Sequence, residues 1–449
     1  MRRCAALVTF ARLMRTFRSW SGLHTSTPSR WAMPASEDEI AARLREAARA
    51  GRRVRPIGSG HSWSDIALPD DVCVDLQRMR SVLAIDAAAR TIRVQAGIRL
   101  EEITEALDAV GMALPILGSI AKQTVAGAIS TGTHGSSAQH GNLATLVTAM
   151  RLVTPRGAAD QADALVLDEE HPLLPAARVS LGALGVITEV TLRVCPAFCL
   201  EEELEPMPFE RAVRELRAIA KSAEYVKVWW FPSTGAAQVF RYRRTPQRAI
   251  DRPLARFVDE RLINQTLFEL VLRLAGRFPA ITPHVNAAIA RAYFRAGRRI
   301  ARSDRCFNVS MPPIHREMEV AIDLDHAAEL LREIDAAIRD EGIRVNFPCE
   351  IRFVQGDDAW MSPAYGRDTC QIGFYQAESA DLTRYFQRAT ELASRHDGRP
   401  HWGKETTMSG DAIRAAYPMS DRFLELRREL DPHGTLSNPF LDRVLGPIE

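Results

Sequence analysis

Apolar residues recur along the first half of the chain at two spacings, which together predict alternating helices and strands. Residues 37–50 place them three to four positions apart, as an amphipathic helix does, and Ser36 stands at the expected N-cap. Residues 100–110 repeat this spacing and end at Gly111, where a C-terminal glycine cap belongs. Short apolar runs predict strands at 52–57, 72–76, 91–95 and 186–194.

The pattern changes after Pro196, and no internal repeat is present. Longer predicted helices then alternate with strands: helices at 209–223 and 326–341, a strand at 225–231, and a largely helical, arginine-rich stretch at 254–300. We therefore predict an α+β protein with an N-terminal extension at 1–20, a first domain at 21–197 and a second at 198–449. We expect the C-terminal segment, about 405–449, to pack back onto the first domain.

Composition narrows the class of protein. The chain has 449 residues, 46% of them hydrophobic, which is enough for a sizeable core. Its net charge of +2 gives no reason to expect a nucleic-acid partner. The seven cysteines are scattered without a C-x-x-C pair, so neither a disulfide framework nor a metal site is predicted. Nearly all basic residues are arginine, a bias typical of GC-rich bacterial genomes.

The first twenty residues contain five arginines and no acid. They indicate either a transit-like segment, a weak signal, or residues ahead of an alternative start at Met14. No apolar run reaches the roughly 20 residues that span a bilayer. The best candidate, 267–275, contains Glu269 and Arg273 and is interpreted as an amphipathic surface helix, with peripheral membrane contact as the alternative.

Two glycine-rich segments stand sixty residues apart. In the first, residues 55–62, a strand runs into Gly58-Ser59-Gly60, so successive backbone N–H groups can approach a phosphate. Trp63 stands where a Rossmann fingerprint needs its third glycine. The second, residues 118–141, is dense in small and hydroxyl side chains, which suits a large planar ligand with a diphosphate. Ordinary glycine turns are the alternative.

Two further motifs suggest hydroxyl chemistry. Glu350 and Arg352 lie two apart in a predicted strand and so share a face, where an acid and a guanidinium can bind a vicinal diol. A surface pair is the alternative. The segment Pro400-His401-Trp402-Gly403-Lys404 holds one of only four lysines, a candidate cation for a developing alkoxide. A solvated loop lysine is the alternative.

Together these segments resemble the sugar-lactone oxidases, a family that includes L-gulonolactone, D-arabinono-1,4-lactone and alditol oxidases, which are flavoproteins of the vanillyl-alcohol-oxidase type. The resemblance runs in order from about Trp20 to the C-terminus. It also includes residues 181–187 and Asp431-Pro432-His433-Gly434. It implies that 21–197 is an FAD-binding domain and 198–449 a substrate domain.

The resemblance also assigns individual positions. His61 matches the histidine that bonds covalently to the flavin, while Glu350, Arg352 and Lys404 match the set that binds and activates substrate. The other positions that it assigns to FAD are Ile57, Gly58, Ser59, Gly60, Ser62, Gly118, Ser119, Thr124, Gly127, Thr131, Gly132, Thr133, His134, Ile187 and His401.

The implied reaction is oxidation of an aldono-1,4-lactone hydroxyl, with O2 reduced to H2O2. Alternatives are an alditol oxidase, a lactone dehydrogenase, or a flavin-binding protein without turnover. Gly118 favours an oxidase, because oxygen-reactive relatives carry glycine before the Ser-Ile pair. Animal relatives have a membrane-associating region near 255–290, which Arg256, Arg261, Arg273 and Arg277 interrupt here. We expect a cytoplasmic bacterial protein with at most peripheral membrane contact.

Overall fold

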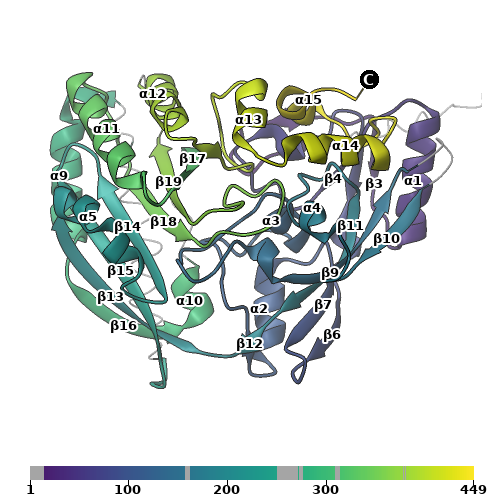
Figure 1. Cartoon of the computed structure of the whole chain (residues 1–449), viewed down its shortest axis with the longest axis horizontal. Helices are drawn as coiled ribbons and strands as arrows, with labels where there is room; N and C mark the ends of the chain where they lie inside the picture. The colour runs from purple at the N-terminus through teal and green to yellow at the C-terminus, as the bar shows by residue number, and fades with distance from the viewer. Residues whose placement is uncertain are drawn as a thin grey trace, which may run out of the picture.

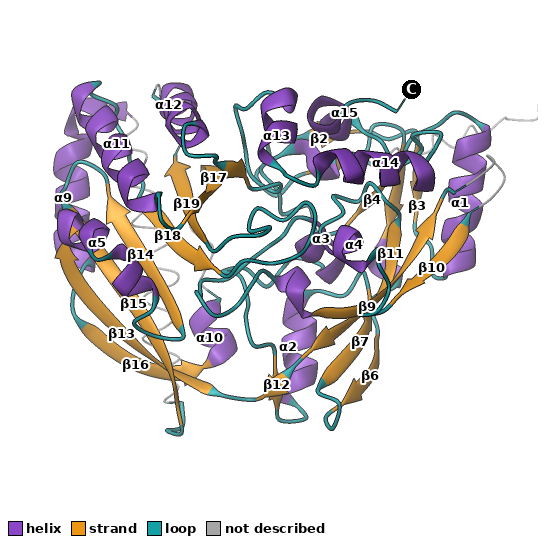
Figure 2. Cartoon of the chain, viewed as in Figure 1, coloured by secondary structure: helices purple, strands orange, loops and turns teal. Residues whose placement is uncertain are grey.

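The chain forms two lobes side by side (Figure 1). The computed structural model describes residues 15–156, 162–249, 272, 277–308, 314–377, 379 and 381–448. Strands and helices together form the outer parts of both lobes, and loops fill much of the region where the lobes meet (Figure 2).

The first lobe contains the elements from β1 to β12. Its helices are α1 Glu37–Arg49, α2 Leu100–Asp108, α3 Val125–Ser130 and α4 Leu174–Arg178. Its strands are β1 Phe17–Arg18, β2 Thr25–Ser26, β3 Arg30–Ala32, β4 Val54–Ile57, β5 Val72–Asp75, β6 Val82–Asp86, β7 Thr91–Gln95, β8 Met112–Ala113, β9 Val147–Thr154, β10 Asp163–Leu167, β11 Val186–Arg193 and β12 Cys195–Pro196.

The second lobe and the C-terminal segment follow. Their described helices are α5 Phe209–Arg214, α6 Leu216–Ala220, α9 Thr282–Tyr293, α10 Ser303–Phe307, α11 Ala327–Asp340, α12 Leu382–Ser394, α13 Gly410–Ala416, α14 Ser420–Leu430 and α15 Pro439–Leu445. Their strands are β13 Cys199–Pro208, β14 Tyr225–Phe231, β15 Ala236–Thr245, β16 Gly297–Arg302, β17 Arg316–Asp323, β18 Cys349–Val354, β19 Thr369–Gln376 and β20 Arg399–Pro400.

Two sheets frame the first lobe. One is parallel, in the order β3-β5-β4, and the other is antiparallel, in the order β10-β9-β11-β7-β6. Because β4 ends at Ile57, the chain enters its first glycine-rich loop directly from a sheet. The hairpin of β1 and β2 covers this point, where Phe17 packs with Ile57 and Cys73.

The second lobe is built on an antiparallel sheet in the order β16-β13-β15-β14-β18-β19-β17-β20. Successive side chains along a strand point to opposite faces. One face carries apolar residues such as Val228, Trp230, Ile351 and Met318, which share a buried core with residues of α5, α6, α11 and α12. The other face is polar over its central strands, and it lies toward the first lobe.

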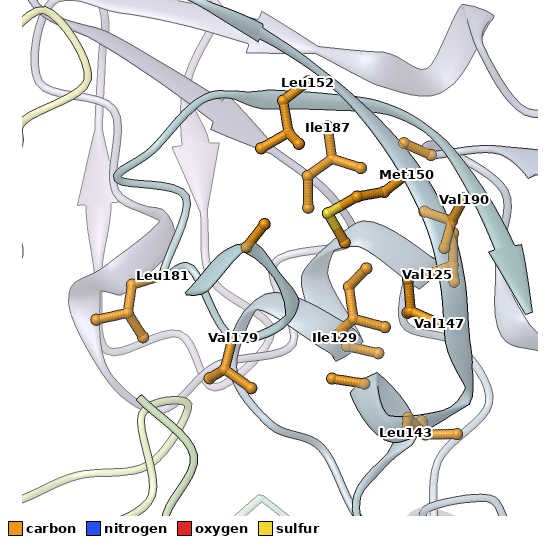
Figure 3. Packing of buried hydrophobic residues seen from close by; sticks show 14 of the residues in the cluster. Val125, Ile129, Leu143, Val147, Met150, Leu152, Val179, Leu181, Ile187 and Val190 are labelled. Atoms are coloured by element: carbon orange, nitrogen blue, oxygen red, sulfur yellow. The ribbon is translucent and has the colours of Figure 1, made fainter. Parts of the chain in front are cut away.

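The C-terminal segment belongs to the first lobe's core. Tyr417, which follows α13, Phe423 of α14 and Phe440 of α15 are buried in the same apolar cluster as the strands and helices of the first lobe. Figure 3 shows part of this cluster, with Val125 and Ile129 of α3 facing side chains of β9 and β11. The C-terminal segment is also hydrogen-bonded to the first lobe, because Val54 N of β4 donates to Thr435 O over 2.6 Å.

Most predicted elements are confirmed. Ser36 caps α1 by accepting from Glu39 N, and β7 and β14 have their predicted bounds. Gly111 and Gly342 adopt φ of +70° and +65°, the left-handed conformation expected of glycines that follow helices. Residues 15–20, assigned to the N-terminal extension, include β1, and residues 1–14 lie outside the described residues.

Two element predictions were wrong. The single helix expected at 209–223 is interrupted at Glu215, whose ψ of 10° leaves the helical range between α5 and α6. The end of the predicted helical stretch 254–300 is instead the strand β16, because it pairs with β13. Arg298 and Arg299 of β16 form ion pairs with Glu201 and Glu202 of β13. Most of 250–276, including nearly all of the predicted surface helix 267–275, lies outside the described residues. Of the helices in the described part of the chain, none is long and apolar enough to cross a bilayer.

Candidate functional site

A cavity that is open to solvent lies in the first lobe, between the end of β4, α3 and the start of β11. The residues predicted to bind FAD that line it are Ile57, Gly58, Ser59, Gly60, His61, Ser62, Thr124, Gly127, Thr131 and Ile187.

The cavity wall is shaped by backbone rather than by large side chains. A Cβ on Gly58 would lie 2.1 Å from Thr124 Oγ1, and one on Gly97 would lie 2.1 Å from Leu76 O. Gly60 has φ of +65°, a conformation that side-chain-bearing residues rarely adopt. No lining residue is acidic, and Arg55 is the one lining residue with a permanent positive charge. The wall therefore fits a ligand with a diphosphate, as FAD has.

His61 lies on the cavity wall with its ring held in place. The indole of Trp20 stacks on it, with ring centroids 5.5 Å apart and an interplanar angle of 20°. Its Nδ1 is buried without a hydrogen-bond partner among the described residues. Burial, with Arg99 and Lys122 nearby, lowers the pKa of His61 to about 4. The imidazole is therefore neutral near pH 7 and keeps the lone pair that a bond to carbon needs.

A polar surface of the second lobe comes from neighbouring strands in register. Lys227 of β14 is paired with Arg352 of β18, and Trp229 with Glu350. Glu350 is also paired with Gly373 of β19, which is paired in turn with Glu319 of β17. Since paired residues share a face, this register gathers residues from distant parts of the sequence.

Glu350 is surrounded by donors. Its Oε1 accepts from Lys227 Nζ at 3.2 Å and from Trp229 Nε1 at 3.0 Å. Its Oε2 accepts from the Tyr375 hydroxyl at 3.1 Å and lies 3.4 Å from Arg352 Nε. Burial raises the pKa of Glu350, but Lys227 and Arg352 outweigh it and the pKa falls to about 2. Glu350 is therefore ionised, and its accepting positions are largely filled by protein.

Glu319 joins Arg352 to the first lobe. Arg352 Nη2 donates to both Glu319 oxygens, at 3.1 and 2.9 Å, and His134 Nε2 lies 2.8 Å from Oε1. Burial opposes ionisation of Glu319, but Arg352 and His134 hold its pKa well below the ordinary value. The guanidinium therefore has a fixed orientation, with Nη1 making no hydrogen bond to a described residue.

Lys404 lies beside a third buried carboxylate. Its Nζ is 2.5 Å from Glu317 Oε1 and 4.0 Å from the centre of the Trp63 ring. The contact with Glu317 is an ion pair without hydrogen-bond alignment, so Oε1 has no aligned donor among the described residues. Burial raises the pKa of Glu317, yet Lys404 and His315 lower it more. The pair is therefore a carboxylate and an ammonium.

The segment that carries Lys404 connects this polar surface to the cavity. His401 N donates to Glu319 O and Glu405 N to Glu317 O, both at 3.0 Å, so the segment is fixed along β17. Trp63, two residues after His61, donates from its backbone N to Gly403 O at 2.8 Å. A Cβ on Gly403 would lie 3.9 Å from Thr131 Oγ1 on the cavity wall. The segment 401–405 therefore contacts both the strand that carries Glu317 and Glu319 and the segment that follows His61.

Several predicted FAD positions do not line the cavity: Gly118, Ser119, Gly132, Thr133, His134 and His401. His134 and His401 lie together instead, with ring centroids 5.6 Å apart, beside Glu319. A Cβ on Gly118 would lie 3.1 Å from Thr133 Cγ2 and 3.2 Å from His134 O. Gly118 therefore packs against the segment that carries Thr133 and His134.

Sequence reasoning missed Lys227, Trp229, Glu317, Glu319 and Tyr375. A signal was present in β17, where Glu317 and Glu319 alternate with Met318 and Val320 in the pattern of a strand with one polar face. Nothing local to the sequence distinguishes that pattern from a strand with one face in solvent.

Comparison with known proteins identifies the class. A family model described as an FAD-binding domain matches residues 28–160, and one described as D-arabinono-1,4-lactone oxidase matches residues 190–444. With the cavity and the adjoining polar surface, these matches define an FAD-dependent oxidoreductase. The chain belongs to the D-arabinono-1,4-lactone oxidase family, and the predicted family is thus confirmed.

Individual relatives align over nearly their whole length. An L-gulono-1,4-lactone dehydrogenase of Mycobacterium tuberculosis is 33% identical, covering 96% of this chain and 99% of the relative. An L-gulonolactone oxidase of Scyliorhinus torazame is 31% identical, covering 95% and 98%. An alditol oxidase of a Streptomyces species is 33% identical, covering 95% and 98%.

A solved structure of cholesterol oxidase from B. sterolicum superimposes with a TM-score of 0.81. It covers 99% of this chain and 100% of that chain at 16% sequence identity. This likeness concerns the fold alone, and it confirms the predicted vanillyl-alcohol-oxidase-type architecture.

Proposed function

We propose that the protein oxidises a hydroxyl group of an aldono-1,4-lactone, of the L-gulono, L-galactono or D-arabinono type, to the ketolactone. The observation that carries this proposal is the charge balance of the polar surface. Lys227, Arg352 and Lys404 are paired with Glu350, Glu319 and Glu317, respectively. A charged substrate would bring an uncompensated charge into this buried site, whereas a neutral polyhydroxy compound would not.

The protein's part in the reaction is to hold the substrate and stabilise charge. Arg352 and Lys404 would bind the reacting oxygen and stabilise the negative charge that develops on it. Glu350 would act as a positioning residue that orients Arg352, since its own oxygens already accept from Lys227, Trp229 and Tyr375. FAD bound in the cavity supplies the two-electron acceptor for the C–H electron pair.

An alditol oxidase is the second candidate, favoured by the relative of that name at 33% identity. Anaerobic addition of substrate separates the two. Bleaching of the yellow flavin by L-gulono-1,4-lactone or D-arabinono-1,4-lactone, but not by xylitol, is expected. Bleaching by xylitol alone would favour the alditol oxidase. No bleaching by any of the three would contradict the proposed function.

We also propose that FAD is attached covalently through His61. The neutral ring, its unpartnered Nδ1 and its place on the cavity wall support this. After acid denaturation and centrifugation, the flavin is expected in the protein pellet. His61→Ala should release it to the supernatant while still binding FAD, because the diphosphate-binding wall is backbone. Flavin in the supernatant of the native protein would contradict the covalent link.

We propose O2 as the electron acceptor, with H2O2 as product, on the basis of Gly118. In Gly118→Ala the added methyl would press on Thr133 and on the backbone of His134. We expect slower reoxidation by O2 with anaerobic reduction by substrate largely retained, both measured by stopped-flow absorbance. Sluggish reoxidation of the native protein, with faster transfer to a dye or cytochrome, would make it a dehydrogenase. The cytoplasmic location and peripheral membrane contact stay predictions.

A further inference from the structure

Oxidation of an alcohol releases a proton from its hydroxyl group, and a group in the site must accept it. The candidates on the described polar surface are the carboxylates Glu317, Glu319 and Glu350 and the imidazoles of His134, His315 and His401. Their hydrogen bonds decide which of them has an accepting position free.

Two of the carboxylates are already occupied. Glu350 accepts from Lys227, Trp229 and Tyr375, and Arg352 Nε lies 3.4 Å from it. Glu319 accepts from Arg352 on both oxygens and is bonded to His134 on one. Either would have to give up a charge-assisted bond before it bound a substrate hydroxyl.

Neither His134 nor His401 has a ring nitrogen open to a substrate hydroxyl, and His315 lies at the other oxygen of Glu317, with its Nε2 3.8 Å from Oε2. His134 Nδ1 lies 2.9 Å from Gly135 O and its Nε2 lies 2.8 Å from Glu319 Oε1, so each ring nitrogen is already engaged with an oxygen of the protein. His401 Nδ1 accepts from Gly403 N at 3.0 Å. Burial lowers the pKa of His401 to about 3, so the ring is neutral and its proton lies on Nε2.

Glu317 differs from all of these. Its side chain is buried, with 1% of its surface exposed, and its Oε1 has no aligned donor. The one cation beside that oxygen is Lys404, which the family resemblance and the proposed function place at the reacting oxygen. A hydroxyl that separated Lys404 Nζ from Glu317 Oε1, now 2.5 Å apart, would accept a hydrogen bond from the ammonium and donate one to the carboxylate.

We propose that Glu317 is a catalytic residue, the base that takes the hydroxyl proton of the substrate. The inference rests on the proposed function. The substrate O–H bond breaks and its proton forms a bond to Glu317 Oε1. The carbinol C–H bond breaks and its hydrogen leaves with the electron pair to FAD. The remaining O–H electron pair forms the second bond of the carbonyl, so that the alcohol is oxidised by two electrons and FAD is reduced by two.

The low pKa of Glu317 does not prevent this role. An alcohol is a far weaker acid than a carboxylic acid, but its hydroxyl becomes strongly acidic as the C–H electron pair leaves. A weakly basic carboxylate can therefore accept the proton during that step, while Lys404 compensates the charge on the oxygen before transfer is complete.

Chemical rescue tests the proposal on the flavin-loaded protein. Glu317→Ala removes the carboxylate and leaves space for formate. We expect the rate constant for anaerobic flavin reduction by L-gulono-1,4-lactone or xylitol to fall by about 10²–10⁴-fold, the usual contribution of a general base. Added formate should raise it in proportion to formate concentration. Glu405→Ala is the matched control, since Glu405 adjoins Lys404 but pairs with Arg316. Its rate constant for flavin reduction should stay near the native value and should not change when formate is added.

The outcomes separate base catalysis from a structural role. Native-like reduction in Glu317→Ala, or a loss that formate does not relieve, would overturn the proposal while leaving the proposed function intact. Native protein that neither probe reduces would overturn both. If Glu317→Ala does not retain FAD, the test is made on the native protein instead. Its rate constant for flavin reduction is expected to show a solvent deuterium isotope effect, and the absence of that effect overturns the proposal.

Discussion

Replacing Lys404 with methionine is expected to lower turnover by about 30- to 1,000-fold while FAD stays bound. This corresponds to losing roughly 2–4 kcal/mol of transition-state stabilisation, the usual cost of removing a charged donor at a developing oxyanion. Methionine keeps the length and the contact with Trp63 but leaves Glu317 buried without its cation. The measurement is the rate constant of anaerobic flavin reduction, with the flavin-to-protein absorbance ratio as the check on bound cofactor.

Lys221→Met provides the control for Lys404→Met. Lys221 follows α6 at the surface and is exposed, so its removal should leave the rate constant unchanged. Near-native reduction in Lys404→Met would remove this lysine from the mechanism. A fall in flavin content of the same size as the fall in rate would assign it to cofactor retention instead.

Arg352→Met is expected to lower the free energy of unfolding by about 3–5 kcal/mol, the usual cost of breaking a buried ion pair from one side. The change leaves Glu319, which has 0% of its surface exposed, with His134 as the side chain among the described residues that still hydrogen-bonds to it. Urea unfolding of preparations with equal flavin content measures the loss. Activity should fall as well, because the guanidinium would no longer meet the substrate.

Two further variants interpret that loss of stability. The double variant Arg352→Met/Glu319→Gln removes the stranded charge and should regain a large part of the lost stability. Arg211→Met breaks an exposed pair, in which the arginine side chain is 49% exposed, and should leave the free energy of unfolding nearly unchanged. An Arg352→Met protein as stable as Arg211→Met would contradict the central place given to the Arg352–Glu319 pair.

The sequence supports prediction wherever the chemistry is local. The glycine loop at 58–60 leaves the end of β4 as expected, and His61 lies on the cavity wall beside it. Glu350 and Arg352 share a face because they lie two apart in one strand. These inferences needed only short-range periodicity and the conformational range of glycine.

What escaped prediction depends on the register between distant strands. Lys227, Glu317 and Tyr375 come together with Glu350 only because β14, β17 and β19 are placed around β18 in one sheet. The split of the predicted helix at 209–223 also has no local sequence signal, since α5 and α6 both bury their apolar residues. The order of strands in a sheet is set by tertiary contacts between distant parts of the chain, so short-range sequence patterns do not predict it.

The C-terminal segment gives the molecule a particular order of assembly. Thr435 bonds to β4, Asn438 bonds to backbone carbonyls of residues 65–68, and α13 to α15 fill the same core as residues near the N-terminus. A ribosome releases the N-terminal part long before it makes these residues. The first lobe must therefore wait, with apolar surface uncovered, until nearly the whole chain has been synthesised. β4, which leads into the cofactor cavity, gains its bond to Thr435 only then, so uptake of FAD should follow translation rather than accompany it.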